Sequence, residues 1–363
     1  MTNLRIQQLR KQIQKHDLDA LLISFPPNYH YATTHFDGSN GLCVLTKNSA
    51  YFLSDFRYKE QAKAQTAKGW DVIIPDGGVG GLYKGVLHYK LLGKAKRIGF
   101  EADHTSVSMF NSLKKMFTGV SLVPTSLLVE NCVAVKEPWE IDRIKTAAKI
   151  SAKVFNEILS MVKPGIVEKD IANEMTYLHK QYGADGDAFD TIIASGIRSS
   201  MPHGRASDKK IKNHEFITID FGCTYKGYNC DITRTVALGK PTAEMRKIYS
   251  IVYEAQQRGF DAARAGISPN ALDKVSRDVI AGYGYGKFFG HSLGHGLGLQ
   301  VHESPRVGQG GGDDPMKENY VITIEPGIYF PKKFGVRIED DIRLRKGACE
   351  MLTPQLPKEL IVL

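Results

Sequence analysis

The sequence predicts two domains, a small α/β domain followed by a larger α+β domain. The first third of the chain alternates apolar strands with amphipathic helices, and the rest combines long helical segments with strand pairs joined by polar turns. In addition, 363 residues exceed one average domain, and 42% hydrophobic with 24% charged residues is ordinary globular composition. We place the two domains at residues 1–132 and 133–363.

The first domain begins with an amphipathic helix that leads into an apolar strand at residues 20–24. Residues 41–58 are typical of a hairpin with its turn near residues 47–49. Strands at residues 69–75 and 96–103 and a helix at 105–117 complete an α/β unit by about residue 130.

Three helices are expected in the second domain. The first has apolar residues at near-helical spacing from Ile141 to Val162, and Pro164 with Gly165 ends it. The other two are predicted at residues 168–182 and 243–265. Because long antiparallel strands lie between these helices, the pattern favours an α+β architecture.

Two acidic residues lie on a predicted hairpin, FITIDFGCTYKGYNCDITRT. If its turn is centred between Tyr225 and Lys226, Asp220 and Asp231 lie directly opposite each other. Opposed residues on one sheet face have Cβ atoms about 5 Å apart, so two bare carboxylates would repel without a cation between them. This hairpin therefore predicts a metal site.

A second hairpin, YVITIEPGIYFPKKFGVRIEDDIRL, repeats the pattern. Its turn at residues 331–333 lies midway between Glu325 and Glu339 and sets them opposite each other. Any one of these acidic residues, taken alone, could be an ordinary surface carboxylate. Asp220 and Glu325, however, each follow an apolar strand, where an unpaired carboxylate would be costly to bury.

Histidines cluster in GHSLGHGLGLQVHESP, where His291, His295 and His302 alternate with glycines that allow close backbone approach. His203 lies on a polar loop that could form the rim of a cleft, although a lone loop histidine is more often a surface residue. Carboxylates with one imidazole favour ions such as Mn²⁺, Co²⁺ or Zn²⁺. Two such ions would activate a water for attack on a carbonyl.

These segments resemble the creatinase, prolidase and methionine aminopeptidase family, whose catalytic domain has the pita-bread fold. The string from His291 to Glu303 is similar to the family's signature around its metal histidine. The two hairpins are similar to its other ligand segments, in the family's order. The resemblance covers nearly the whole chain and implies a creatinase-like α/β domain before the pita-bread domain.

The resemblance also implies roles for particular residues. Two divalent ions, Mn²⁺ with Co²⁺ or Zn²⁺ as alternatives, would be bound by five residues. These are Asp220, Asp231, His295, Glu325 and the bridging Glu339. The substrate side would be formed by His203, His291 and His302, which stabilise the tetrahedral intermediate. Glu325 would also act as general base, and Arg337, two residues before Glu339, would tether a carboxylate.

Within the family, the N-terminal domain and the intact ligand set point to hydrolysis of Xaa-Pro bonds. Many prolidases of this family place an arginine after the metal histidine to hold the dipeptide carboxylate, and no Arg lies between Val307 and Tyr320. GSNG at 38–41 and SDFRYKEQA at 54–62 resemble bacterial aminopeptidase P proteins. We therefore expect an Xaa-Pro aminopeptidase acting on short peptides with proline second, with Xaa-Pro dipeptidase as the alternative. Methionine aminopeptidase and a non-enzymatic homologue are less favoured.

Composition and charge indicate which other classes of partner, such as nucleic acid or membranes, the protein is expected to bind or not to bind. A net charge of +9 without a basic block of five residues favours a generally basic surface over nucleic-acid binding. Five cysteines without C-x-x-C spacing are expected to be free thiols in a reducing cytoplasm. Without an apolar leader or a long apolar run, no membrane association is expected. Family resemblance at residues 35–40 further suggests a homodimer or homotetramer.

Overall fold

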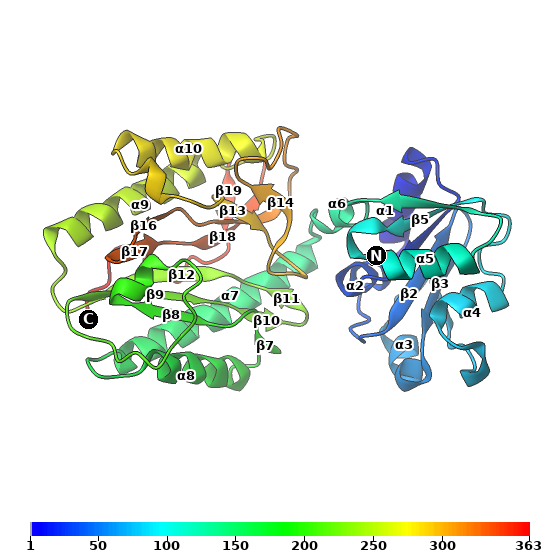
Figure 1. Ribbon diagram of the computed structural model, residues 1–363, viewed down its shortest axis with the longest axis horizontal. Coiled ribbons are helices and arrows are strands. Elements are labelled where there is room, and N and C mark those ends of the chain that lie inside the picture. Colours follow the sequence, from blue (N-terminus) through cyan, green and yellow to red (C-terminus); the bar gives the residue numbers. More distant parts are fainter. Residues whose placement is uncertain (1) are drawn as a thin grey trace. The chain divides into compact units, whose positions relative to one another are not determined.

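The computed structural model describes residues 2–363. These residues form two compact units, the first ending at Val133 and the second spanning Ala134–Leu363 (Figure 1). The predicted order, an α/β unit followed by an α+β unit, is confirmed. All five cysteines are free thiols, and three of them, Cys43, Cys223 and Cys230, are buried. Among the described residues, no helix is long and apolar enough to cross a membrane.

The first unit is built on a six-stranded mixed sheet in the order β4-β3-β2-β1-β5-β6. The central strand β1 is entirely apolar and buried. It pairs antiparallel with β2 and parallel with β5. The six strands are β1 (Ala20–Ile23), β2 (Gly41–Thr46), β3 (Ala50–Ser54), β4 (Asp71–Ile73), β5 (Arg97–Glu101) and β6 (Ser121–Thr125). The helices are α1 (Thr2–Lys15), α2 (Pro26–Thr33), α3 (Lys59–Gln65), α4 (Leu82–His88), α5 (Val107–Met116) and α6 (Glu130–Val133).

The second unit places its strands between two pairs of helices, with α7 and α8 on one side and α9 and α10 on the other (Figure 1). The helices are α7 (Pro138–Ile158), α8 (Glu168–Gln181), α9 (Ala243–Ala262) and α10 (Pro269–Gly282). Helix α7 begins with a capping box in which Glu137 and Glu140 each bond the other's backbone N–H. The first three were predicted, and α10 was not.

Two sheets carry the acidic strands of this unit. One has the order β12-β9-β8 and the other β14-β13-β15-β18-β19. A bridge between Thr233 and Glu339 joins them. Their strands are β8 (Ile192–Ser195), β9 (Glu215–Phe221), β12 (Ile232–Leu238), β13 (Gly294–Gly296), β14 (Glu303–Val307), β15 (Val321–Ile324), β18 (Asp340–Leu344) and β19 (Cys349–Met351). Smaller sheets contain β7 (Gly186–Asp187), β10 (Cys223–Tyr225), β11 (Tyr228–Asn229), β16 (Gly327–Phe330) and β17 (Phe334–Arg337).

Strand alternation separates an apolar face from a polar face on both sheets. On β9, Ile217 and Ile219 pack into the cluster that includes α7 and α8, so Asp220 points the other way. On β15, Ile322 and Ile324 pack into the cluster that includes α9 and α10, so the side chain following in alternation, Glu325, also points away from the helices. The polar faces of the two sheets therefore supply the functional groups.

The predicted register of the first hairpin is wrong. Asp220 pairs with Thr233, and Tyr225 pairs with Tyr228, so the turn consists of Lys226 and Gly227. Both turn residues have positive φ, 48° and 79°, which is the conformation that two-residue hairpin loops require. Asp231 lies two positions from Thr233 and so is diagonal to Asp220 on the same face rather than opposite to it.

The second hairpin has the predicted register. Gly327 pairs with Arg337, and Ile324 pairs with Asp340, so the same alignment holds on both sides of Glu325 and Glu339. These two carboxylates therefore come from opposite positions, at the break between the short hairpin β16–β17 and the larger sheet.

Candidate metal centre

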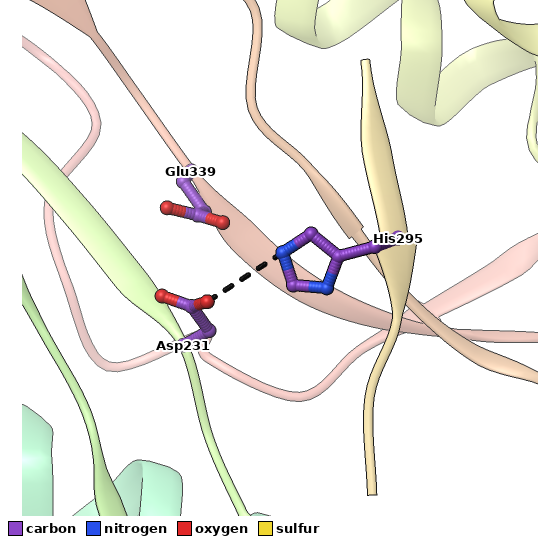
Figure 2. Close-up of side chains that lie close together, drawn as sticks. All are labelled: Asp231, His295 and Glu339. Carbon is purple, nitrogen blue, oxygen red and sulfur yellow. Dashed lines mark ion pairs between the residues drawn. The ribbon is translucent and has the colours of Figure 1, made fainter. Parts of the chain in front are cut away.

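Three groups from separate segments converge between the two sheets. Ligand atoms of Asp231, His295 and Glu339 all lie within 4.8 Å of one another (Figure 2). His295 Nε2 is 3.7 Å from Asp231 Oδ2 and 3.5 Å from Glu325 Oε1. Asp220 joins from β9 through Arg337, whose Nη2 donates to Asp220 Oδ2. The five residues predicted as ligands therefore face one region.

The hydrogen bond of His295 determines which ring nitrogen faces the carboxylates. Its Nδ1 lies 3.1 Å from the carbonyl oxygen of Gly296, an acceptor, so Nδ1 carries the proton. Burial lowers the pKa of His295 to about 4, so the ring is neutral near pH 7. Its Nε2 lone pair consequently points at carboxylate oxygens. A nitrogen lone pair and a carboxylate oxygen repel each other unless a cation lies between them. A ring whose Nε2 lone pair faces the carboxylates has the orientation that a metal ligand needs.

The acidic side chains of this centre are buried so close together that their ionised forms repel one another. Burial and the nearby Glu339 carboxylate raise the pKa values of Asp231 and Glu325 well above the ordinary range. Burial and Asp220 raise the pKa of Glu339 to about 8. Asp220 Oδ1 and Asp231 Oδ1 are buried and have no hydrogen-bond partner among the described residues. Buried carboxylate oxygens without donors fit bound divalent cations.

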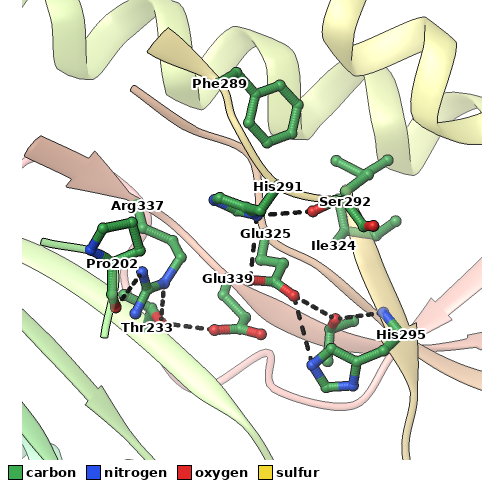
Figure 3. Close-up of polar contacts among 12 residues, drawn as sticks. Pro202, Thr233, Phe289, His291, Ser292, His295, Ile324, Glu325, Arg337 and Glu339 are labelled. Carbon is green, nitrogen blue, oxygen red and sulfur yellow. Dashed lines mark hydrogen bonds and ion pairs between the residues drawn. The ribbon is translucent and has the colours of Figure 1, made fainter. Parts of the chain in front are cut away.

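A single guanidinium, that of Arg337, lies among these carboxylates in the part of the chain that the structure describes, and it is on the polar face of β17 as expected. Its Nε donates to Thr233 Oγ1 and its Nη1 donates to the Pro202 carbonyl, both at 3.0 Å (Figure 3). The same Nη1 also donates to Tyr329 Oη at 3.0 Å. Its ion pair with Asp220 is the predicted tether to an acidic group. Thr233 Oγ1 also donates to Glu339 Oε2 at 2.6 Å, which orients that side chain.

The other three histidines lie around this centre. The His302 ring centroid is 4.1 Å from that of His295. His291 Nε2 is 3.0 Å from Tyr329 Oη, and His291 Nδ1 lies 2.8 Å from the Ser292 carbonyl and 4.0 Å from Glu325. His203 is exposed, and its charge is among those that lower the pKa values of His291 and His302.

Known proteins provide an independent comparison. Residues 142–346 match the metallopeptidase family M24. The chain belongs to this family. Residues 5–134 match the creatinase/prolidase N-terminal domain. The pita-bread architecture and the two-domain organisation are thereby confirmed, and this M24 chain is a metallopeptidase.

Three similar proteins illustrate the range of the family. An Xaa-Pro dipeptidase of Pyrococcus horikoshii is 38% identical over 360 residues, which cover 99% of each chain. A structure described as Xaa-Pro dipeptidase from Bacillus anthracis has a TM-score of 0.94 at 39% identity and covers 100% of both chains. A structure described as X-Pro aminopeptidase from Thermotoga maritima has a TM-score of 0.86 at 39% identity, covering 97% of this chain and 100% of that chain.

Sequence reasoning missed two residues near the centre of this M24 enzyme. Tyr329 lies within the quoted TIEPGIY string, but only the fold shows that it bridges Arg337 and His291. The expected arginine was placed in the loop that follows Val307, whereas Arg306 lies just before that loop, at the end of β14. It pairs directly with His295 across β13 and β14, so both side chains are on one face of the sheet. The signal that could have found it is this pairing, not a loop.

Proposed function

We propose that the chain is an Xaa-Pro dipeptidase that works with two divalent ions, of which Mn²⁺ is the first choice. The proposed ligands are Asp220, Asp231, His295, Glu325 and Glu339. Supporting this set are the unprotonated Nε2 of His295 and the donor-free oxygens of Asp220 and Asp231. When bound, such cations lower the pKa of a water molecule and polarise the scissile carbonyl.

The chain's own groups would share the remaining work. Glu325 has a pKa raised well above its ordinary value by burial and by Glu339, which suits a carboxylate that accepts a proton from the attacking water. The ring N–H groups of His302 and His203 would donate hydrogen bonds to the developing oxyanion. His291 is engaged at both ring nitrogens, so we assign to it the placement of Tyr329.

Arg306 is the single observation that favours a dipeptide over a longer peptide. Its side chain is exposed on the same sheet face as His295, and its Nε donates to Ser292 Oγ at 2.8 Å. Within residues 2–363 it forms no ion pair with an acidic side chain, so its charge is available for a ligand. A guanidinium on the same sheet face as His295 suits the C-terminal carboxylate of a dipeptide.

The similar proteins support the same choice, because Xaa-Pro dipeptidase describes both the Pyrococcus horikoshii relative and the Bacillus anthracis structure. The second candidate is the Xaa-Pro aminopeptidase expected from the sequence, which the Thermotoga maritima structure favours. Four substrates separate the candidates: Ala-Pro, Ala-Pro amide, Ala-Pro-Ala and Met-Ala, each tested with Mn²⁺-loaded protein. We expect Ala-Pro to be hydrolysed with the highest kcat/KM, whereas faster turnover of Ala-Pro-Ala would support the aminopeptidase.

An Arg306→Gln variant tests the assignment directly. Loss of a hydrogen bond to a charged group costs about 1.5 to 3 kcal/mol, so kcat/KM for Ala-Pro should fall by about 10- to 150-fold. For Ala-Pro amide, which has no carboxylate, the same substitution should change kcat/KM by less than about twofold. Equal losses on both substrates would show that Arg306 does not bind the carboxylate.

Oligomeric state remains a prediction. A homodimer or homotetramer is expected from the family resemblance, and sedimentation over a range of protein concentrations would test it.

A further inference from the structure

A buried ion pair lies beside the candidate centre and has no part in the proposed mechanism. Lys136 and Glu303 have side chains only 1% and 4% exposed, and Lys136 Nζ donates to Glu303 Oε1. Lys136 Nζ also lies 3.3 Å from the Ala134 carbonyl, and Glu303 Oε2 accepts the Gln300 N–H at 3.3 Å. Charged groups are rarely buried this completely without a specific partner.

This ion pair lies next to His302 in the chain, so it can influence where the His302 side chain is held. Glu303 is the first residue of β14, and His302 directly precedes it. His302 itself lies in a bend rather than in the strand. The Glu303 carboxylate is buried against Lys136, whereas the His302 ring is exposed and lies 4.1 Å from that of His295. Because the two residues are adjacent in the chain, the ion pair that fixes Glu303 also restrains the backbone that carries His302.

The surrounding backbone leaves little room for a substitute. Asn229 holds the start of this segment, because its N–H and Nδ2 donate to the Gly298 carbonyl at 2.9 and 3.0 Å. A Cβ on Gly298 would lie 2.8 Å from Lys136 Cε and 3.0 Å from Glu303 Oε1. The lysine stem thus packs directly against Gly298. We call residues 297–303, which follow β13, the His302 segment.

We propose that Lys136 is a positioning residue for His302 and acts through Glu303. This inference rests on the proposed role of His302 in meeting the oxyanion. A buried ion pair contributes little net stability, since replacing both partners by apolar groups is often neutral or stabilising. Removal of one partner leaves an uncompensated charge. The pair therefore serves geometry rather than folding.

The test uses Mn²⁺-loaded full-length enzyme and three variants, Lys136→Met, Glu303→Leu and the double variant. Because a misplacement of about 1 Å can cost about 10²-fold in rate, each single variant should lose about 10- to 100-fold in kcat with KM changed less than about threefold. In the double variant the thermal midpoint should return to that of the wild type, whereas kcat should stay low. Recovery of kcat together with the midpoint would mean that the pair acts only on stability.

A second comparison asks whether the effect passes through His302. In a His302→Gln background, adding Lys136→Met should lower kcat by less than about twofold, because the group it positions is already gone. If the two losses multiply, Lys136 acts by another route and the proposal is wrong.

A matched control is Lys145→Met, which removes a lysine from a partly buried ion pair with Glu350 in the same unit. It should leave kcat unchanged. A substrate-free measurement completes the design: Lys136→Met, but not Lys145→Met, should speed amide hydrogen exchange in residues 297–303.

Different results would refute the proposed function and the proposed role of Lys136. A wild type inactive on every peptide would refute the proposed function, and the exchange data would still judge the anchoring of the His302 segment. A wild type active on Ala-Pro, with a Lys136→Met variant unchanged in both kcat and exchange, would refute this inference alone.

Discussion

At the scale of single residues, the centre is a set of acids kept in an unfavourable state. Asp231, Glu325 and Glu339 are buried near one another, and their pKa values are raised by burial and by mutual repulsion. Among residues 2–363, Arg337 alone is placed to offset this charge, and its ion pair is with Asp220. Without a metal, the folded protein favours protonated acids, whereas cations favour the ionised acids.

This conflict predicts a pH dependence of stability for metal-free protein. A group whose pKa is raised on folding contributes stability that is present below its unfolded pKa and is lost as pH rises through its folded pKa. For Glu339 that window runs from its ordinary 4.5 to about 8. The thermal midpoint of metal-free protein should therefore fall as pH increases across this window, as measured by calorimetry.

Two controls accompany this measurement. A Glu339→Gln variant has no such proton to lose, so its midpoint should fall less steeply. Saturating Mn²⁺ should raise the midpoint more at high pH than at low pH, because protons and cations compete for the same oxygens. A metal-free midpoint that rises steadily with pH would contradict the assignment of raised pKa values to these acids.

At the scale of elements, the hairpins show what a sequence pattern can and cannot predict. Strand pairs, apolar faces and the acids at their ends could be predicted, because alternation has a period of two residues. The register of the first hairpin could not, because it depends on which two residues adopt positive φ. Lys226 does so without being glycine or asparagine, which shifted the expected turn by one residue.

Gly222 offers a test at this scale. It directly follows β9, and a Cβ at this position would be 1.9 Å from the carbonyl oxygen of Cys230, the residue before Asp231. A Gly222→Ala variant must displace the backbone next to Asp231 and should bind Mn²⁺ at least about tenfold more weakly, by analogy with the 10- to 100-fold effects of altered ligand orientation. Calorimetric titration measures this affinity.

Gly186→Ala is the matched control, since Gly186 lies in the sheet with β10 and a Cβ there meets nothing within 4 Å. Its Mn²⁺ affinity should equal that of the wild type. If both variants lost Mn²⁺ affinity equally, Gly222 would not be needed to maintain the spacing of the two aspartates.

At the scale of the whole molecule, the two-domain order and the convergence of distant segments follow from motifs in the sequence. Helix α10 was not predicted, although its apolar residues recur at helical spacing between Leu272 and Ile280. Its buried face also carries polar residues, since Asp273 pairs with Arg277 and Ser276 Oγ donates to the Ala255 carbonyl. Arg306 was missed because its relation to His295 exists only as a pairing between strands.

The proposed centre holds two divalent ions among Asp220, Asp231, His295, Glu325 and Glu339. Anomalous diffraction from crystals of the Mn²⁺-loaded protein would locate these ions. We predict two anomalous peaks per chain, about 3.5 to 4 Å apart, as in other two-metal hydrolytic sites, and contacted by these five side chains. Peaks at other residues only, or no peak within reach of His295 Nε2, would refute this ligand set.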